Sequence, residues 1–174
     1  MNATQRREII VEAILSGSTP VSASALAKKC NVSRQVVVGD IALLRAAGHE
    51  ILATARGYMV AEGKDNNQYI GKIPCCHNAE NTPNELYIIV DLGATVVNVI
   101  VEHDLYGEIT GPLYIKNRAD ADAFYNRVKA SEVKLLSELK SGIHIHTLAC
   151  RDKIHFEQVY HALDAAGFVV TNND

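Results

Sequence analysis

Two predicted helices joined by a three-residue turn constrain the fold of this chain more than any other feature. The segment VSASALAKKCNVSRQVVVGDIALLRAAG (residues 21–48) carries apolar side chains at helical spacing on both sides of a turn at residues 30–32. A further helix is predicted at residues 4–17, and the two short strands around residues 55–57 are typical of a hairpin. This order of three helices and a hairpin predicts a winged helix-turn-helix.

Candidate capping residues set the predicted ends of these helices. Thr4, Ser22 and Ser33 each precede an apolar run, and a hydroxyl there can accept a hydrogen bond from a free backbone N–H group. Gly17 and Gly48 follow the last turns of the first and third helices, where glycine commonly ends a helix. The third helix therefore begins at Ser33.

In a helix-turn-helix the second helix of the pair places its N-terminal end in the major groove of DNA. Ser33, Arg34 and Gln35 open that helix here; Arg can bind guanine edges, and Gln can bind adenine edges. Arg56, at the tip of the hairpin, is placed to reach a phosphate or the minor groove. The features predict binding to double-stranded DNA, and the alternative is a three-helix packing module with solvated charges.

The charge of the chain is unevenly distributed. Residues 1–60 hold seven Lys and Arg against four Asp and Glu, whereas residues 61–174 hold ten against sixteen. A basic first part on an acidic remainder is consistent with a polyanionic partner for the first part alone.

A polar segment at residues 61–73 separates the first part of the chain from the rest. It contains two glycines and lacks helical periodicity, so we expect a domain boundary within residues 61–70. The predicted domains are a DNA-binding domain at 1–62 and a regulatory domain at 70–174. The sequence has no apolar run of about 18 residues and no secretory leader, so we expect a cytoplasmic protein with no membrane partner.

The second part mixes strands and helices. Runs rich in β-branched residues predict strands at 85–93, 95–103, 109–115, 143–150 and 168–170. Helical patterns predict helices at 118–131 and 151–167, with a further short helix within 132–142. Gly93 and Ala94 are expected to form the turn between the first two strands. With the helices packed on one face of the sheet, the fold class is α+β and the architecture is an open sandwich.

Two histidines in the predicted strand at 143–150 lie two residues apart. Because side chains alternate along a strand, His144 and His146 project from the same face. Two imidazoles make half a metal site, and the segment CCHNAENTPNEL (residues 75–86) offers His77 and Glu85 as further donors. Such a set suits Zn(II), Ni(II), Fe(II) or Mn(II). The alternative is a pair of exposed strand histidines.

The four cysteines show no C-x-x-C spacing, so we expect free thiols or metal ligands rather than a disulfide framework. The adjacent Cys75 and Cys76 can compete for the metal, and thiolate ligands would favour zinc.

Three segments together resemble a known family. They are SRQVVVGDIALLRAAGHEILATARGYMV, CCHNAENTPNELYIIVDLGATVVNVIVEHDLYGEI and GIHIHTLAC. They resemble the niacin-responsive repressors, NiaR, which join a winged helix-turn-helix to a "3H" domain named for its three histidines. The likeness extends from about residue 5 to residue 170.

The resemblance implies a homodimeric transcriptional repressor of NAD biosynthesis or niacin-uptake genes, with nicotinic acid as co-repressor. It also implies a divalent transition metal in the 3H domain, nickel in the family, with zinc or iron as other possibilities. Matched residue by residue, the metal ligands fall on His77, Glu85, His144 and His146. The resemblance assigns no residues to nicotinic acid and implies no catalytic residue.

Two other classes of protein stay open at this point. A metalloenzyme carrying a DNA-binding domain could activate water at the metal, but we find no obvious general acid or base, such as the Glu of an H-E-x-x-H motif. A metal or redox sensor would use Cys75 and Cys76 as its switch, and its operator binding would ignore nicotinate. We expect a regulator and not an enzyme.

Overall fold

The computed structural model describes residues 1–60 and 67–170. The chain divides into two compact units, Met1–Gly63 and Lys64–Asp174, called here the N-terminal unit and the C-terminal unit. The predicted domain end at residue 62 and the last four residues of the predicted regulatory domain lie outside the described residues.

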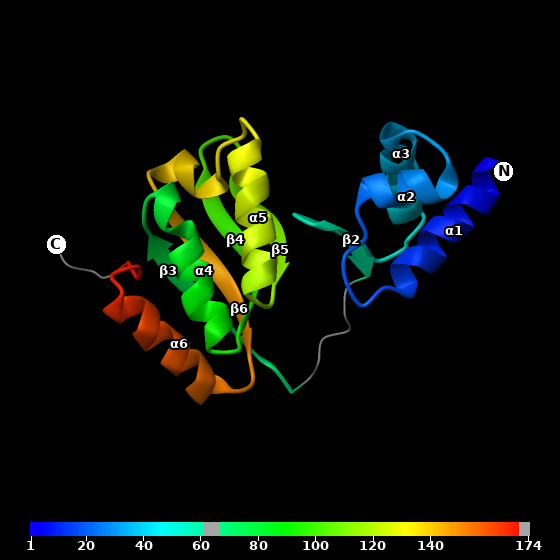
Figure 1. Ribbon diagram of the computed structural model, residues 1–174. Helices are drawn as coiled ribbons and strands as arrows, with labels where there is room; N and C mark the ends of the chain where they lie inside the picture. Colours follow the sequence, from blue (N-terminus) through cyan, green and yellow to red (C-terminus); the bar gives the residue numbers. More distant parts are fainter. Residues whose placement is uncertain (61–66, 171–174) are drawn as a thin grey trace. The chain divides into compact units, whose positions relative to one another are not determined.

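The N-terminal unit contains three helices followed by a two-stranded hairpin, as predicted (Figure 1). The helices are α1 (Ala3–Leu15), α2 (Ala23–Cys30) and α3 (Arg34–Ala46), and the antiparallel strands are β1 (Ile51–Thr54) and β2 (Gly57–Val60). Asn31 ends α2 in the left-handed conformation at φ 51°, which turns the chain sharply into α3. Apolar side chains of all three helices and β1, including Ile10, Leu26 and Val37, form a buried core.

Two of the three predicted caps are confirmed. The side chains of Ser22 and Ser33 accept hydrogen bonds from Ala25 N and Val36 N. The prediction of Thr4 is wrong, because α1 begins earlier. The Asn2 side chain accepts from Gln5 N, and the Gln5 side chain accepts in return from Asn2 N. This capping box satisfies two free N–H groups at once.

The C-terminal unit is built on a four-stranded antiparallel sheet in the order β3-β6-β4-β5. The strands are β3 (Tyr69–Cys76), β4 (Thr95–His103), β5 (Gly107–Ile115) and β6 (Ile143–Cys150). The predicted strands at 95–103, 109–115 and 143–150 are confirmed. The predicted helices are α5 (Arg118–Ala130) and α6 (Lys153–Ala165), and the further short helix is a 3-10 helix, η2 (Leu136–Lys140).

The predicted strand at 85–93 is wrong: this run lies in a helix, α4 (Thr82–Asp91), which follows the 3-10 helix η1 (Ala79–Asn81). Its β-branched residues resemble a strand, but Pro83 stands in the first turn, where proline favours a helix start. The buried Leu86, Ile89 and Val90 recur at helical spacing. Gly93, at φ 87°, therefore ends a helix rather than joining two strands.

The fourth strand of the sheet is β3, which sequence analysis assigned partly to the polar boundary. Its inward side chains are buried and its outward ones, among them Lys72 and Pro74, are exposed. Proline is tolerated because β3 lies at the sheet edge. The predicted strand at 168–170 is reduced to one isolated bridge between Val169 and Cys75.

Three helices cover one face of the sheet (Figure 1). Figure 1 shows α4 and α5 side by side in front of the strands, and α6 also packs against α4, β3 and β6. On the covered face β6 buries its even-numbered residues, His144, His146, Leu148 and Cys150. Gly71 of β3 lets α6 approach closely, because an added Cβ would lie 2.3 Å from the Phe156 ring. The α+β fold class is confirmed, and the histidine pair points into the layer between sheet and helices.

Candidate metal centre

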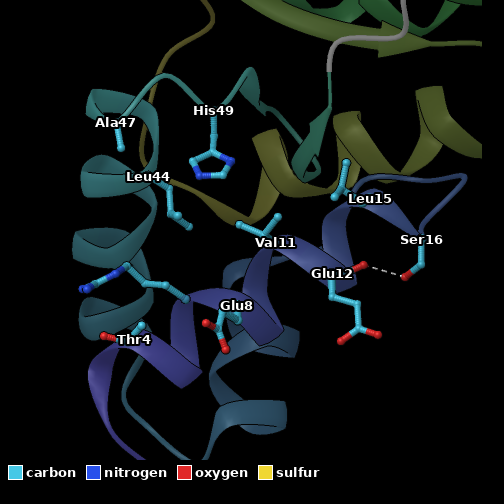
Figure 2. A pocket seen from close by; sticks show the side chains of 10 residues that line it. Thr4, Glu8, Val11, Glu12, Leu15, Ser16, Leu44, Ala47 and His49 are labelled. Atoms are coloured by element: carbon cyan, nitrogen blue, oxygen red, sulfur yellow. Dashed lines mark hydrogen bonds between the residues drawn. The ribbon is translucent and has the colours of Figure 1, made fainter.

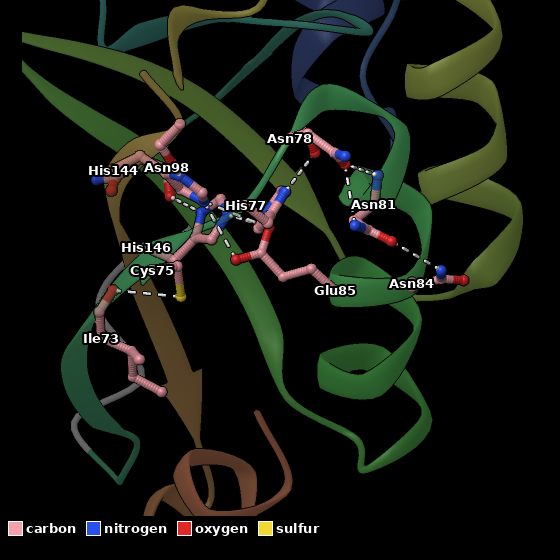
Figure 3. Close-up of polar contacts among 11 residues, drawn as sticks. Ile73, Cys75, His77, Asn78, Asn81, Asn84, Glu85, Asn98, His144 and His146 are labelled. Atoms are coloured by element: carbon pink, nitrogen blue, oxygen red, sulfur yellow. Dashed lines mark hydrogen bonds and ion pairs between the residues drawn. The ribbon is translucent and has the colours of Figure 1, made fainter. Parts of the chain in front are cut away.

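Three imidazoles and one carboxylate meet between the sheet and α4 (Figure 3). His77 directly follows β3, Glu85 lies in the first turns of α4, and His144 and His146 come from β6. Glu85 is held by a helix rather than by the predicted strand, yet it reaches the same point. All four predicted donors therefore belong to one cluster of side chains.

The Glu85 carboxylate is the common partner of the three rings. Its Oε2 atom lies 2.7 Å from His77 Nε2 and 3.2 Å from His146 Nε2, and its Oε1 atom lies 3.1 Å from His144 Nε2. The Glu85 side chain is 1% exposed, and those of the three histidines are between 2% and 5% exposed. Water therefore has little access to the charges of this cluster.

The opposite nitrogen of each ring faces a backbone carbonyl oxygen. His77 Nδ1 is 2.7 Å from Asn78 O, His144 Nδ1 is 2.8 Å from Gly142 O, and His146 Nδ1 is 2.9 Å from Asn98 O. A carbonyl only accepts, so each Nδ1 carries the hydrogen and donates it. In metalloproteins this second hydrogen bond fixes the ring and leaves Nε2 free to bind the ion.

The consequence is a centre that needs positive charge. With hydrogen on Nδ1, each neutral ring presents an Nε2 lone pair toward a carboxylate that also only accepts. Three lone pairs and one negative charge in a buried site repel one another unless protons or a metal cation lie between them. The residues present thus fit a divalent transition metal, for which imidazole and carboxylate are common ligands.

The close contact between the Glu85 carboxylate and the imidazoles also shifts the pKa values of the cluster. Burial opposes ionisation of Glu85, but the charge of His146 and the hydrogen bonds of the histidines outweigh burial, so the pKa of Glu85 lies well below its ordinary value. Burial likewise lowers the pKa of His77 and His146, and the hydrogen bond and charge of Glu85 reverse this, so both pKa values are raised. In the absence of a metal, protons on these rings balance the carboxylate.

The sequence comparisons agree with this architecture. A model of the 3H domain matches residues 71–172, and a model of an HTH domain matches residues 6–59. The chain is 37% identical over 172 residues to the transcription repressor NadR of Bacillus subtilis (strain 168), covering 98% of this chain and 95% of that protein. It is 36% identical over 166 residues to the probable transcription repressor NiaR of Thermotoga maritima, covering 95% and 94%. The chain belongs to this family of 3H-domain repressors.

Family membership decides the class of protein. The prediction that the repressor is not an enzyme is confirmed, because both relatives are named as transcription repressors. Within the described residues, no helix is both long and apolar enough to cross a membrane.

The predicted DNA contacts of the repressor lie at the start of α3 and in the hairpin. Ser33, Arg34 and Gln35 are all exposed, as a helix end that enters a groove requires. Arg56 stands in the two-residue turn between β1 and β2 and is partly buried. Asp40 of α3 is buried, and its carboxylate is held by Arg6, with Nε 2.5 Å from Oδ2. This carboxylate is therefore directed into the N-terminal unit. The role of the exposed residues in DNA binding stays a prediction.

A hollow in the N-terminal unit lies between α1 and the end of α3 (Figure 2). Val11, Leu15 and Leu44 give it an apolar lining. Figure 2 shows one hydrogen bond among the residues drawn, from the Ser16 hydroxyl to the Glu12 carbonyl oxygen at 2.8 Å. Its polar side chains do not converge as those of the metal centre do, so we assign it no ligand.

Cys75, which was expected to be a free thiol or a metal ligand, lies beside the cluster. One ligand atom each from Cys75, Glu85 and His144 lies within 4.8 Å of the other two. Burial raises the pKa of the Cys75 thiol, and the Glu85 carboxylate adds to the rise. Glu85 and His144 belong both to the four predicted metal ligands and to this group of three. The sequence did not indicate that Cys75 lies beside His144, because that placement depends on the pairing of β3 with β6.

Two other histidines have structural partners. Buried His155 accepts a hydrogen bond from Arg151 N at Nδ1, and its Nε2 donates to Leu92 O. His103 Nδ1 accepts from the backbone N–H groups of Leu105 and Tyr106 in the turn between β4 and β5. Neither belongs to the metal centre.

Proposed function

We propose that the repressor is niacin-responsive: it binds its operator as a homodimer, and nicotinic acid acts as co-repressor through the metal centre. The genes that it controls would be those of NAD biosynthesis or niacin uptake, in the cytoplasm. The DNA-binding domain would comprise residues 1–62 and the regulatory domain residues 70–174. The observation that carries the regulatory part is the convergence of three Nε2 atoms on the buried Glu85 carboxylate.

The residues that would hold the metal are His77, Glu85, His144 and His146. A bound nickel, zinc or iron ion would supply open positions for the carboxylate or ring nitrogen of nicotinic acid. The chain itself orients the rings through the carbonyl oxygens of Asn78, Gly142 and Asn98 and excludes water from the carboxylate. These groups make a site whose donors are fixed before the ligand arrives.

Nicotinic acid can strengthen repression only if it favours the arrangement of the two subunits that fits the operator. In such a dimer each α3 would enter a major groove, with half-sites separated by about 34 Å or a multiple of it. Ser33, Arg34 and Gln35 would contact bases or phosphates there, and Arg56 would contact the neighbouring backbone or minor groove. The regulatory domain, which is acidic, would act by holding two basic domains together.

The second candidate, a redox sensor that switches by joining Cys75 to Cys76, is disfavoured. The two residues are neighbours in β3, with Cys75 buried on the covered face and Cys76 exposed on the other. A disulfide requires the two Cβ atoms to approach to about 3.5–4.5 Å, which side chains on opposite faces of a strand do not do. Pairing them would require β3 to break.

The test is binding to the DNA upstream of the repressor's own gene, measured by fluorescence anisotropy at fixed salt. Nicotinic acid should tighten binding of the metal-loaded repressor, whereas nicotinamide, which lacks the carboxylate, should have a much weaker effect. Equal affinity with and without nicotinic acid would reject the co-repressor. Tightening by metal alone, with no dependence on nicotinic acid, would support a metal sensor instead.

A further inference from the structure

Cys75 occupies a position in the sheet that directs its sulfur toward the metal centre. Its register partner on β6 is His144, and both side chains project from the covered face. Directly opposed residues on one face have Cβ atoms about 4.5–5.5 Å apart. The pairing of β3 with β6 thus places a thiol beside an imidazole that the metal centre already uses, and Figure 3 shows Cys75 next to this cluster.

The distances suit a shared ion. Zinc binds sulfur at about 2.3 Å and nitrogen at about 2.0–2.1 Å, so two such ligands at a tetrahedral angle are about 3.6 Å apart. One ligand atom each of Cys75, Glu85 and His144 lies within 4.8 Å of the others. Each separation would therefore have to shorten by at most about 1.2 Å for all three atoms to bind one tetrahedral zinc ion.

We propose that Cys75 is a ligand of the metal ion, and that its sulfur makes the centre prefer a thiophilic ion, zinc, over nickel. This inference rests on the metal centre of the proposed function and adds a donor to it. Soft thiolate ligands select zinc, whereas imidazole alone accepts zinc and nickel alike. On binding, the Cys75 S–H bond breaks, the sulfur–metal bond forms, and one proton is released to solvent.

The rival explanation is that Cys75 only fills space beside the centre. Its sulfur does have a hydrogen-bond contact, with the Ile73 carbonyl oxygen, but this contact is 3.8 Å long and weak. A small apolar residue would serve as well for packing alone. The two explanations differ in one observable, a sulfur–metal bond.

Cobalt(II) tests for that bond, because it takes zinc sites and a thiolate ligand gives it a charge-transfer band in the near ultraviolet. The metal-free full-length repressor is titrated with Co(II) and its absorption recorded. We expect the band in the unsubstituted protein and in Cys76→Ser. We expect Cys75→Ser to bind Co(II) through its imidazoles and carboxylate without the band.

Cys76→Ser is the matched control, since it makes the same change one residue away on the opposite, exposed face of β3. If Cys75→Ser fails to fold, Cys75→Val decides, because valine fits a buried strand position and cannot bind metal. A band that persists in a folded Cys75 variant overturns the proposal. Bound Co(II) without a band in the unsubstituted protein does so as well, as does the absence of Co(II) binding.

Zinc affinity gives a second measure. Removing a residue that only hydrogen-bonds a metal ligand already weakens metal binding by about tenfold or more. Loss of a ligand itself should therefore weaken zinc binding by more than about tenfold. Nickel affinity should change less, so the preference for zinc should fall. An unchanged ratio of the two affinities in Cys75→Ser would also overturn the proposal. The nicotinic acid response is measured separately, so bound Co(II) without the band would leave the proposed co-repressor function intact.

Discussion

Replacing Gly142 by alanine should disrupt the metal centre although residue 142 offers no side-chain donor. Gly142 precedes β6 at φ 92°, and a Cβ there would lie 2.3 Å from the His77 carbonyl oxygen. The left-handed backbone costs an L-residue about 1–2 kcal/mol. Because ordinary contacts are about 3.5 Å or longer, the backbone at His77 must also move about 1 Å away from β6. Ligand groups must be held within about 0.5 Å, so His77 and His144 could no longer share an ion well.

The expected magnitudes follow from these two costs. Gly142→Ala should lower the stability of the C-terminal unit by about 2–5 kcal/mol, the sum of the backbone cost and the overpacking cost. Zinc affinity should fall at least about tenfold. Gly107→Ala is the matched control, since Gly107 also has a positive φ, 75°, but nothing lies within 4 Å of its added Cβ. It should show the backbone cost alone.

Hydrogen exchange of β6 amides measures the stability of the C-terminal unit separately from that of the N-terminal unit. Competition with a chromophoric chelator measures zinc affinity in the same samples. The reasoning is refuted if Gly142→Ala costs no more than Gly107→Ala and binds zinc as tightly as the unsubstituted repressor.

His144→Ala should lose both the metal and the nicotinic acid response while the N-terminal unit stays folded. His161→Ala, at an exposed position of α6, is the control and should change neither. Elemental analysis that finds equal metal in the two variants would contradict this prediction. Metal occupancy should fall with decreasing pH, because protons compete for the same Nε2 atoms, and the raised pKa values of His77 and His146 place the onset above the ordinary histidine value of about 6.5. Above about pH 6.5 the stability of the metal-free repressor should fall as pH rises, because the contribution of His77 and His146 is full below about pH 6.5 and is lost as pH rises through their raised pKa values. The contribution of Glu85 is lost only at acid pH, as pH falls from about 4.3 through its lowered pKa. A melting temperature of chelator-treated protein that rises between about pH 6.5 and 8 would argue against these signs. Arg34→Ala should lose about 1–3 kcal/mol of discrimination at one or two operator bases, and unchanged operator affinity in this variant would exclude the base contact. Arg56→Ala should weaken binding to DNA of any sequence and reduce the slope of log affinity against log salt concentration by about one. Residues 1–63 alone should sediment as a monomer and bind the operator weakly, and a dimer of this fragment as stable as the full chain would show that the C-terminal unit does not hold the dimer.

Sequence patterns predicted the elements whose signals are local. The strand β4 is rich in β-branched residues, β6 alternates in its first half, and the helices α5 and α6 have apolar residues at helical spacing. The helix α4 has two conflicting signals, since its β-branched residues favour a strand and its Pro83 and apolar spacing favour a helix. Packing against the sheet decides the conflict, because only the helix buries Leu86, Ile89 and Val90 together. The edge strand β3 was missed because its first half lies in the polar segment and its outward residues include Lys72 and Pro74.

The sequence predicted the side chains of the candidate site but not the backbone carbonyl oxygens that orient them. His144 and His146 follow from strand alternation, and Glu85 was offered both by the segment at residues 75–86 and by the family resemblance, even though its element was misassigned. The oxygen that holds His146 comes from the backbone of Asn98, where the pairing of β4 with β6 shifts register between Val96 and Asn98. A carbonyl oxygen leaves no mark in the sequence, and a register shift appears only when two strands are paired.

The register of β6 explains why isoleucine and histidine alternate in SGIHIHTLAC. A slip of one residue would turn Ile143 and Ile145 toward Glu85 and carry both histidines to the opposite face of the sheet. The carboxylate would then be buried among apolar side chains, at a cost far above that of leaving Ile143 exposed and Ile145 half-buried. The imidazoles thus select the register in which they meet Glu85, and the same register sets Cys75 opposite His144. Whichever ion the centre binds, its donor set is a consequence of strand pairing that the histidines themselves help to enforce.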